Sequence, residues 1–226
     1  MINEQWKKRK TVRYFDSKVI PSTDKIEKLE HCINFLPIQT SIANDSLPNF
    51  LVFKVGPDEY QFKYELLTNV FHTKEKDEYF CCLYDAPYVF IMVELTTIGP
   101  LGDVATVEPD NIILHTNLGV TMGALISEAV SNDLSITTLA CTAGSINCDI
   151  LNKKYNTELQ KFREIHKNQK LSLGEVLGAV CVGYEPPTII PYAHPVTGLS
   201  KHKTLNLNYR PYKKLNKNQP FMYIHD

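Results

Sequence analysis

The sequence predicts an α+β fold in which helices flank a mixed β-sheet, in a single domain over residues 1–226. Short apolar segments rich in β-branched residues alternate along the chain with segments of helical periodicity. This alternation is typical of helices packed around a sheet. From residue 185 the periodicity ends and Tyr and Pro become frequent. We therefore expect residues 185–226 to form an extended C-terminal arm.

The individual elements follow from periodicity and from their end signals. Ser22 or Thr23 can cap the first helix, and Pro37 ends it. Gly56 and Pro57 stop the first strand, and the strongest strand pattern, YVFIMVEL, begins directly after Pro87. We expect strands at residues 50–55, 88–95, 134–139 and 175–184, helices at residues 22–36, 59–71, 111–130 and 150–166, and loops at residues 38–47, 99–107 and 140–148.

The helix expected at residues 111–130 carries two glycines four residues apart, Gly119 and Gly123. Each glycine costs about 1 kcal/mol of helix stability relative to alanine. Together they form a notch without side chains, where another backbone can approach closely. The occupant of the notch is either another helix of the same chain or the same helix of a second copy. We expect the second, a homodimer built on this helix.

Composition excludes several function classes. The formal net charge of −1 gives no positive field for nucleic acid, and no apolar stretch is long enough to span a bilayer. The charged N-terminus lacks the apolar region of a signal peptide, so we expect a cytoplasmic protein with free thiols. The six cysteines and seven histidines show no metal-ligand spacing. Nucleotide-binding glycine loops, zinc-protease motifs and nucleophile elbows are absent from the sequence.

A basic segment near the N-terminus is the strongest candidate for ligand binding. Arg9, Lys10 and Arg13 place three cations in one short stretch with the hydroxyl of Thr11. Charge-assisted and bidentate hydrogen bonds of this kind suit a phosphate monoester. Charge runs more often form a solvated face, and composition alone favours that alternative.

The segment Arg9-Lys10-Thr11-Val12-Arg13-Tyr14-Phe15 resembles the N-terminal signature of the nitroreductase family, R-[RHK]-[ST]-x-[RK]-x-F. Three later segments resemble the same family in the same order: the Asp85-Ala86-Pro87-Tyr88-Val89 entry to a central strand, the long helix from residue 114, and the strand that ends in Gly183-Tyr184. The resemblance covers about residues 6 to 214. It implies a mainly antiparallel, nitroreductase-like sheet and FMN bound at the interface of a homodimer.

The resemblance also implies a set of cofactor-binding residues. Arg9, Lys10, Thr11 and Arg13 would hold the FMN phosphate and ribityl chain. Arg210 matches a later basic position of the family, although a surface arginine is an equally good reading.

Two further segments would approach the flavin from loops. The loop after Pro37 would come from the partner subunit, with Gln39, Ser41 or Asn44 as its polar contact. The backbone of Ala143-Gly144 would lie near the flavin ring, and an ordinary glycine turn is the alternative there.

The implied activity is that of an FMN-dependent oxidoreductase, with NAD(P)H as the hydride donor. The acceptor would be a nitroaromatic, a quinone or an unsaturated metabolite, and the kinetics would be ping-pong. The flavin would carry the chemistry, so no catalytic side chain is expected. Tyr79, Cys81 and Cys82 stand where the family has Asn and Lys contacts, and the loop after Pro37 is longer. These departures leave three alternatives: a flavin enzyme of the same fold that catalyses dehalogenation or flavin breakdown, a non-catalytic flavin-binding protein, and an unrelated α/β binding module.

Overall fold

The computed structural model describes residues 12, 15–36, 47–69, 81–98, 104–106, 111–140 and 148–186. The chain divides into two units, Met1–Pro186 and Pro187–Asp226, and every described residue belongs to the first. The arm expected at residues 185–226 therefore lies almost entirely outside the described residues, and its extended form stays a prediction.

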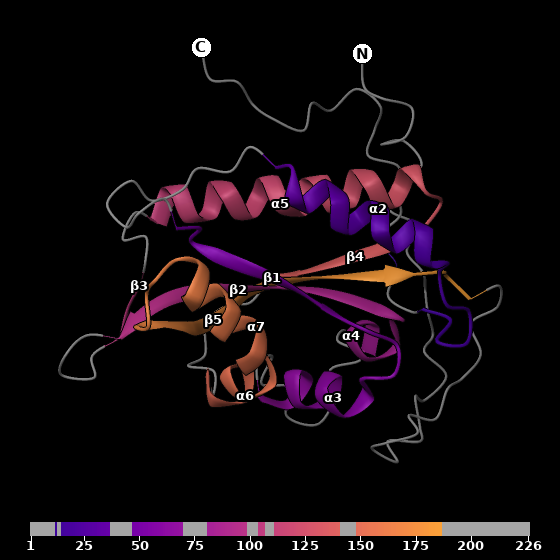
Figure 1. Cartoon of the computed structure of the whole chain (residues 1–226). Coiled ribbons are helices and arrows are strands. Elements are labelled where there is room, and N and C mark those ends of the chain that lie inside the picture. The colour runs from indigo at the N-terminus through magenta and orange to yellow at the C-terminus, as the bar shows by residue number, and fades with distance from the viewer. Residues whose placement is uncertain are drawn as a thin grey trace, which may run out of the picture. The chain divides into compact units, whose positions relative to one another are not determined.

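A five-stranded sheet forms the centre of the described unit (Figure 1). Its order is β1-β2-β5-β4, and β3 pairs with β2 outside this path. Every described pairing is antiparallel, in agreement with a mainly antiparallel sheet. The strands are β1 (Phe50–Val55), β2 (Tyr88–Ile98), β3 (Val104–Thr106), β4 (Ser135–Ala140) and β5 (Leu171–Gly183).

Helices cover both faces of this sheet (Figure 1). On one face lie α2 (Thr23–Asn34) and α5 (Asn111–Ser131). On the other face lie α3 (Tyr60–Asn69), α4 (Cys81–Asp85), α6 (Cys148–Lys154) and α7 (Asn156–Ile165). None of the described helices is long and apolar enough to cross a membrane.

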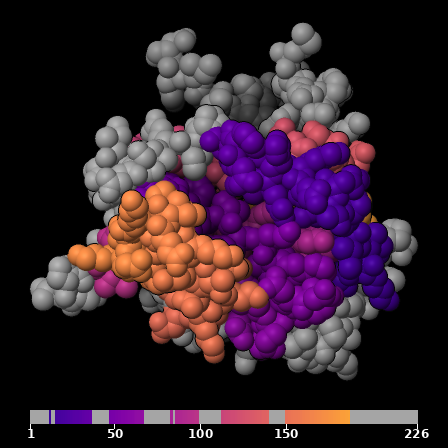
Figure 2. Space-filling view, in the orientation of Figure 1, coloured from indigo at the N-terminus to yellow at the C-terminus, as the bar shows by residue number. Residues whose placement is uncertain are grey.

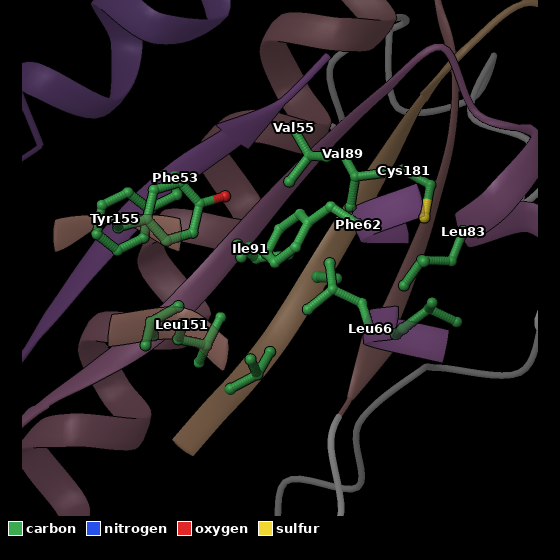
Figure 3. Packing of buried hydrophobic residues seen from close by; sticks show 14 of the residues in the cluster. Phe53, Val55, Phe62, Leu66, Leu83, Val89, Ile91, Leu151, Tyr155 and Cys181 are labelled. Atoms are coloured by element: carbon green, nitrogen blue, oxygen red, sulfur yellow. The ribbon is translucent and has the colours of Figure 1, made fainter. Parts of the chain in front are cut away.

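Two apolar cores lie on the two sides of the sheet, and β2 contributes to both. Val89 and Ile91 pack into the core beneath α3 and α6, whereas Phe90 and Met92 pack beneath α2 and α5. A strand covered on both faces buries successive side chains, which explains why residues 88–95 are apolar without alternation. Figure 3 shows the first core, where Phe53 of β1 stacks on Tyr155 with ring centroids 3.9 Å apart.

Four expectations about the elements need correction. The loop expected at residues 99–107 contains strand β3, the short helix α4 was not predicted, and β5 begins at Leu171 rather than at residue 175. The helix expected at residues 150–166 is divided into α6 and α7 at Tyr155. The Tyr155 ring is inserted between Phe53 and Phe62, and this tertiary contact overrides the local helical pattern.

Candidate functional site

A buried lysine lies at the centre of the candidate site. Lys63 on α3 falls on the same helical stripe as Phe62 and Leu66, and its side chain is fully buried. Its Nζ donates hydrogen bonds to the carbonyl oxygens of Ala86, at 2.7 Å, and Pro87, at 3.0 Å. Figure 3 shows the apolar surroundings of α3, with Phe62 and Leu66 near Leu83.

Asp85, Ala86 and Pro87 form the α4–β2 junction, which the ammonium group of Lys63 stabilises. Ala86 N donates to Cys82 O, which closes the last turn of α4. The carbonyls of Ala86 and Pro87 precede the first β2–β5 pair, Tyr88 with Val182, so no strand partner is available to them in that ladder. A cation at the carboxyl end of a helix also interacts favourably with the last carbonyl groups.

Burial shifts the pKa values of both charged groups at this junction toward neutrality. It lowers the pKa of Lys63 from 10.5 to about 8, although the nearby Cys181, Glu59, Asp85 and Asp58 act in the opposite direction. Burial raises the pKa of Asp85 from 3.8 to about 7, against the attraction of Lys63. Among the described residues, the Oδ1 atom of Asp85 has no hydrogen-bond partner.

Two buried thiols lie next to this pair. Burial and a hydrogen bond with Cys82 raise the pKa of Cys181 well above its usual value. A buried thiol with a raised pKa is a poor nucleophile. The three described cysteines, Cys32, Cys82 and Cys181, are free, so Cys181 is the small core residue that its apolar segment predicts.

The N-terminal anchor, defined here as Val12, Phe15 and Asp16, joins the basic segment to the sheet. Val12 N donates to Ile136 O of β4 at 3.2 Å, and Asp16 N donates to Tyr184 O after β5 at 2.8 Å. The Val12 and Phe15 side chains are buried in the core. The chain around the predicted phosphate site is thus attached at both ends of the anchor.

A glycine connects the N-terminal anchor to the α4–β2 junction. A Cβ atom built at Gly183 would lie 2.6 Å from Pro87 Cδ and 2.9 Å from Phe15 Cδ1. Such distances are far shorter than a normal van der Waals contact between carbon atoms. The proline and phenylalanine rings therefore pack together over β5 only because residue 183 has no side chain.

All ten cofactor-binding residues expected from the sequence lie outside the described residues: Arg9, Lys10, Thr11, Arg13, Pro37, Gln39, Ser41, Ala143, Gly144 and Arg210. Their roles stay predictions. Val12 and Phe15 are the described members of the signature, and both are held against the sheet.

Sequence analysis missed Lys63 and Asp85. The signal for Lys63 was its position: a lysine between Phe62 and Leu66, on the apolar stripe of a helix, is expected to be buried. A buried lysine in turn requires acceptors and a nearby acid. No local pattern marks Asp85, because its burial depends on α3 packing over it.

The surface between α3 and α6 is closed by an ion pair between Lys154 and Glu59. Figure 2 shows the segments around α6 and α7 in contact with those around α3 on the viewed face. Glu59 also accepts a hydrogen bond from Gly56 N, at 2.6 Å, which fixes the turn before α3. Lys63 is therefore enclosed by a rigid set of neighbours.

The glycine notch of α5 is open in the described unit. Outside the helix itself, no described atom lies within 4 Å of a Cβ built at Gly119 or Gly123. On the same helix Ile112 is 76% exposed and Val120 is 40% exposed. Within the described residues, no other helix of the same chain fills the notch.

Comparison with known proteins relates the fold to one group of solved structures. No protein-family model and no curated protein matches the chain. A nitroreductase family protein from Clostridium novyi NT matches with a TM-score of 0.53 at 13% identity, over 83% of this chain and 86% of that one. A nitroreductase with bound FMN from Bacteroides fragilis NCTC 9343 has 17% identity over 89% and 95% of the two chains, with a TM-score of 0.48. An FMN-dependent nitroreductase from Clostridium difficile R20291 has 16% identity over 97% and 100%, with a TM-score of 0.48. The Clostridium novyi match confirms the predicted nitroreductase-like α+β fold.

Proposed function

We propose that this chain is an FMN-dependent oxidoreductase that transfers hydride from NAD(P)H to a small acceptor and works as a homodimer. The observation that carries the proposal is the attachment of the phosphate-binding signature, through Val12 and Phe15, to the sheet of a nitroreductase-like fold. We place the protein in the cytoplasm on the sequence grounds given above.

The described part of the signature fits a role in holding a phosphate. Two backbone hydrogen bonds and two buried side chains restrain the N-terminal anchor before any ligand binds. Restraint of this kind reduces the conformational entropy that binding must remove. Arg9, Lys10, Thr11 and Arg13 would supply the charged and hydroxyl donors to the phosphate.

The remaining residues would surround the rest of the cofactor. Gln39 and Ser41 after Pro37 would contact it from the partner subunit, and Arg210 would add a second cation. The backbone of Ala143-Gly144 would lie near the ring system, where an N–H group stabilises negative charge. When bound, FMN would supply the hydride-transfer chemistry. The protein would then need no nucleophile or general acid, and the sequence contains no recognisable constellation of either.

The homodimer rests on the open glycine notch of α5. A helix with two glycines on an exposed face gives up about 2 kcal/mol of helix propensity in total without a contact in its own chain. A second copy of α5 is the occupant that we propose, because a twofold axis brings the same surface of both subunits together. Nitroaromatics, quinones and unsaturated metabolites are the proposed acceptors, with ping-pong kinetics because donor and acceptor would use one site in turn.

The visible absorption spectrum of the purified protein tests the proposal directly. We expect a flavin spectrum with about one FMN per chain. The double variant Arg9→Ala with Arg13→Ala should purify mainly without flavin, because each arginine contributes a charged hydrogen bond worth roughly 1.5–3 kcal/mol. The control is Lys153→Ala with Lys161→Ala, which removes two exposed charges on α6 and α7 and should retain FMN.

Each outcome assigns the failure to one part of the proposal. A wild-type protein that is colourless and takes up no added FMN would refute the flavoprotein assignment. Full flavin content in the arginine double variant would refute the phosphate site only. NADPH oxidation with a nitroaromatic acceptor would support the reductase activity. A flavin-loaded protein that oxidises neither NADH nor NADPH with any of the three acceptor classes would instead be a flavin enzyme with other chemistry or a non-catalytic flavin-binding protein.

A further inference from the structure

We infer that Lys63 is a positioning residue for the phosphate-binding segment, acting through Pro87 and Phe15 although it lies on the opposite side of the α4–β2 junction. The inference rests on the proposed function, because it assigns Lys63 to the same cofactor site. Three consecutive contacts connect the lysine to the signature.

The first contact joins α3 to the α4–β2 junction. The Lys63 ammonium group donates to the carbonyl oxygens of Ala86 and Pro87. A fully buried ammonium group is costly, and an apolar side chain of similar volume is often neutral or better for stability at such a site. The lysine is therefore better explained by the two carbonyl groups that it orients than by core packing.

The second contact passes from the junction to the N-terminal anchor. Because Lys63 holds the Pro87 carbonyl, it limits the movement of the Pro87 ring. That ring shares the space above Gly183 with the Phe15 ring, since both have an atom within 3 Å of one built Cβ position. A shift of Pro87 would release Phe15 from this space.

The third contact is the anchor itself. Phe15 lies between Val12 and Asp16, whose backbone N–H groups bind Ile136 O and Tyr184 O. Five of the seven residues in the signature, Arg9 to Arg13, precede Phe15 by two to six positions. A rigid Phe15 therefore sets the direction in which the basic segment leaves the sheet.

The test compares two flavins that differ only in the phosphate. Dissociation constants for FMN and for riboflavin are measured at pH 7 by quenching of flavin fluorescence, for the wild type and for Lys63→Met. Methionine is unbranched and fills a similar volume without hydrogen bonds to the junction. We expect the FMN dissociation constant to rise about 10-fold or more, as the loss of one well-formed hydrogen bond to the phosphate would produce. The riboflavin dissociation constant should change less than about twofold, since no phosphate contact is involved.

Two further variants keep the test decisive. Lys54→Met removes a half-exposed lysine that pairs with Glu30 on the surface, and it should leave both dissociation constants unchanged. If Lys63→Met does not fold, Gly183→Ala provides the second arm, because its methyl group would separate the Pro87 and Phe15 rings without altering Lys63. It should cause the same selective loss of FMN affinity.

An equal loss of affinity for FMN and riboflavin would overturn the inference, because a merely structural lysine would affect the whole pocket. Unchanged affinity for both flavins would overturn it as well, and in both cases the proposed function would stand. A wild-type protein that binds neither flavin would refute the proposed function itself and the inference with it.

Discussion

Replacing Gly123 by leucine should separate the folding of the subunit from its assembly. No described atom lies within 4 Å of a Cβ at this position, so the larger side chain meets no obstacle within the subunit. Leucine is also a better helix former than glycine by about 0.8 kcal/mol. The isolated Gly123→Leu subunit should therefore be as stable as the wild type, or more stable by up to about 1 kcal/mol.

The same change should be damaging at a helix interface. Overpacking of a close contact costs typically 1–3 kcal/mol, and a twofold axis introduces the leucine twice. The expected loss of dimer stability is therefore roughly 2–6 kcal/mol, which corresponds to an increase in the dissociation constant from about 30-fold to more than 10⁴-fold.

Sedimentation velocity over a range of protein concentrations measures this change, and flavin absorbance in the same cell reports whether FMN leaves with the partner. Urea unfolding of the variant monitors the fold separately. Lys161→Leu introduces the same side chain at an exposed position of α7 and should sediment like the wild type. A Gly123→Leu protein that stays dimeric at all concentrations would refute the reasoning, as would a wild-type monomer that retains flavin.

Three further predictions concern the fold around the site. Because the folded-state pKa of Lys63 is about 8 and its usual value 10.5, its folding contribution grows as pH rises through this window and is lost as pH falls through 8. The unfolding free energy of the wild type should thus gain about 3 kcal/mol relative to Lys63→Met between pH 8 and 10.5, and a pH-independent difference would contradict the burial of a charge. Gly183→Ala should destabilise the protein by about 1–3 kcal/mol in urea unfolding, whereas Gly56→Ala, with its nearest contact at 3.6 Å, should have little effect. The Asn152 side chain bonds both backbone groups of Leu173, so Asn152→Leu should cost about 2 kcal/mol, and unchanged unfolding would show that water replaces the amide.

Much of the fold could be predicted because its signals are local. The run at residues 88–95 is apolar at every position but one, and it forms β2, covered on both faces. The helix expected at residues 111–130 is α5, within one residue of the predicted end. Periodicity and end signals of this kind depend on residues only a few positions apart, so they can be read without knowledge of the fold.

The errors occurred where distant residues determine the local structure. Tyr155 interrupts a helical pattern because its ring packs on Phe53 and Phe62, about a hundred residues earlier in the chain. β3 has only three residues, and its pairing with β2 is not visible in its own composition. Neither contact can be inferred from sequence neighbours.

For this protein, the sequence by itself determined the nitroreductase-like fold class, the order of most elements and the basic signature with its predicted cofactor. Each of these depends on residue type and spacing along the chain. Tertiary structure alone decided that Lys63 is buried against the carbonyls of Ala86 and Pro87, and that Gly183 makes room for two rings. The reason is physical: burial and close packing are properties of surfaces brought together by folding, and the residues that share such a surface lie far apart in sequence.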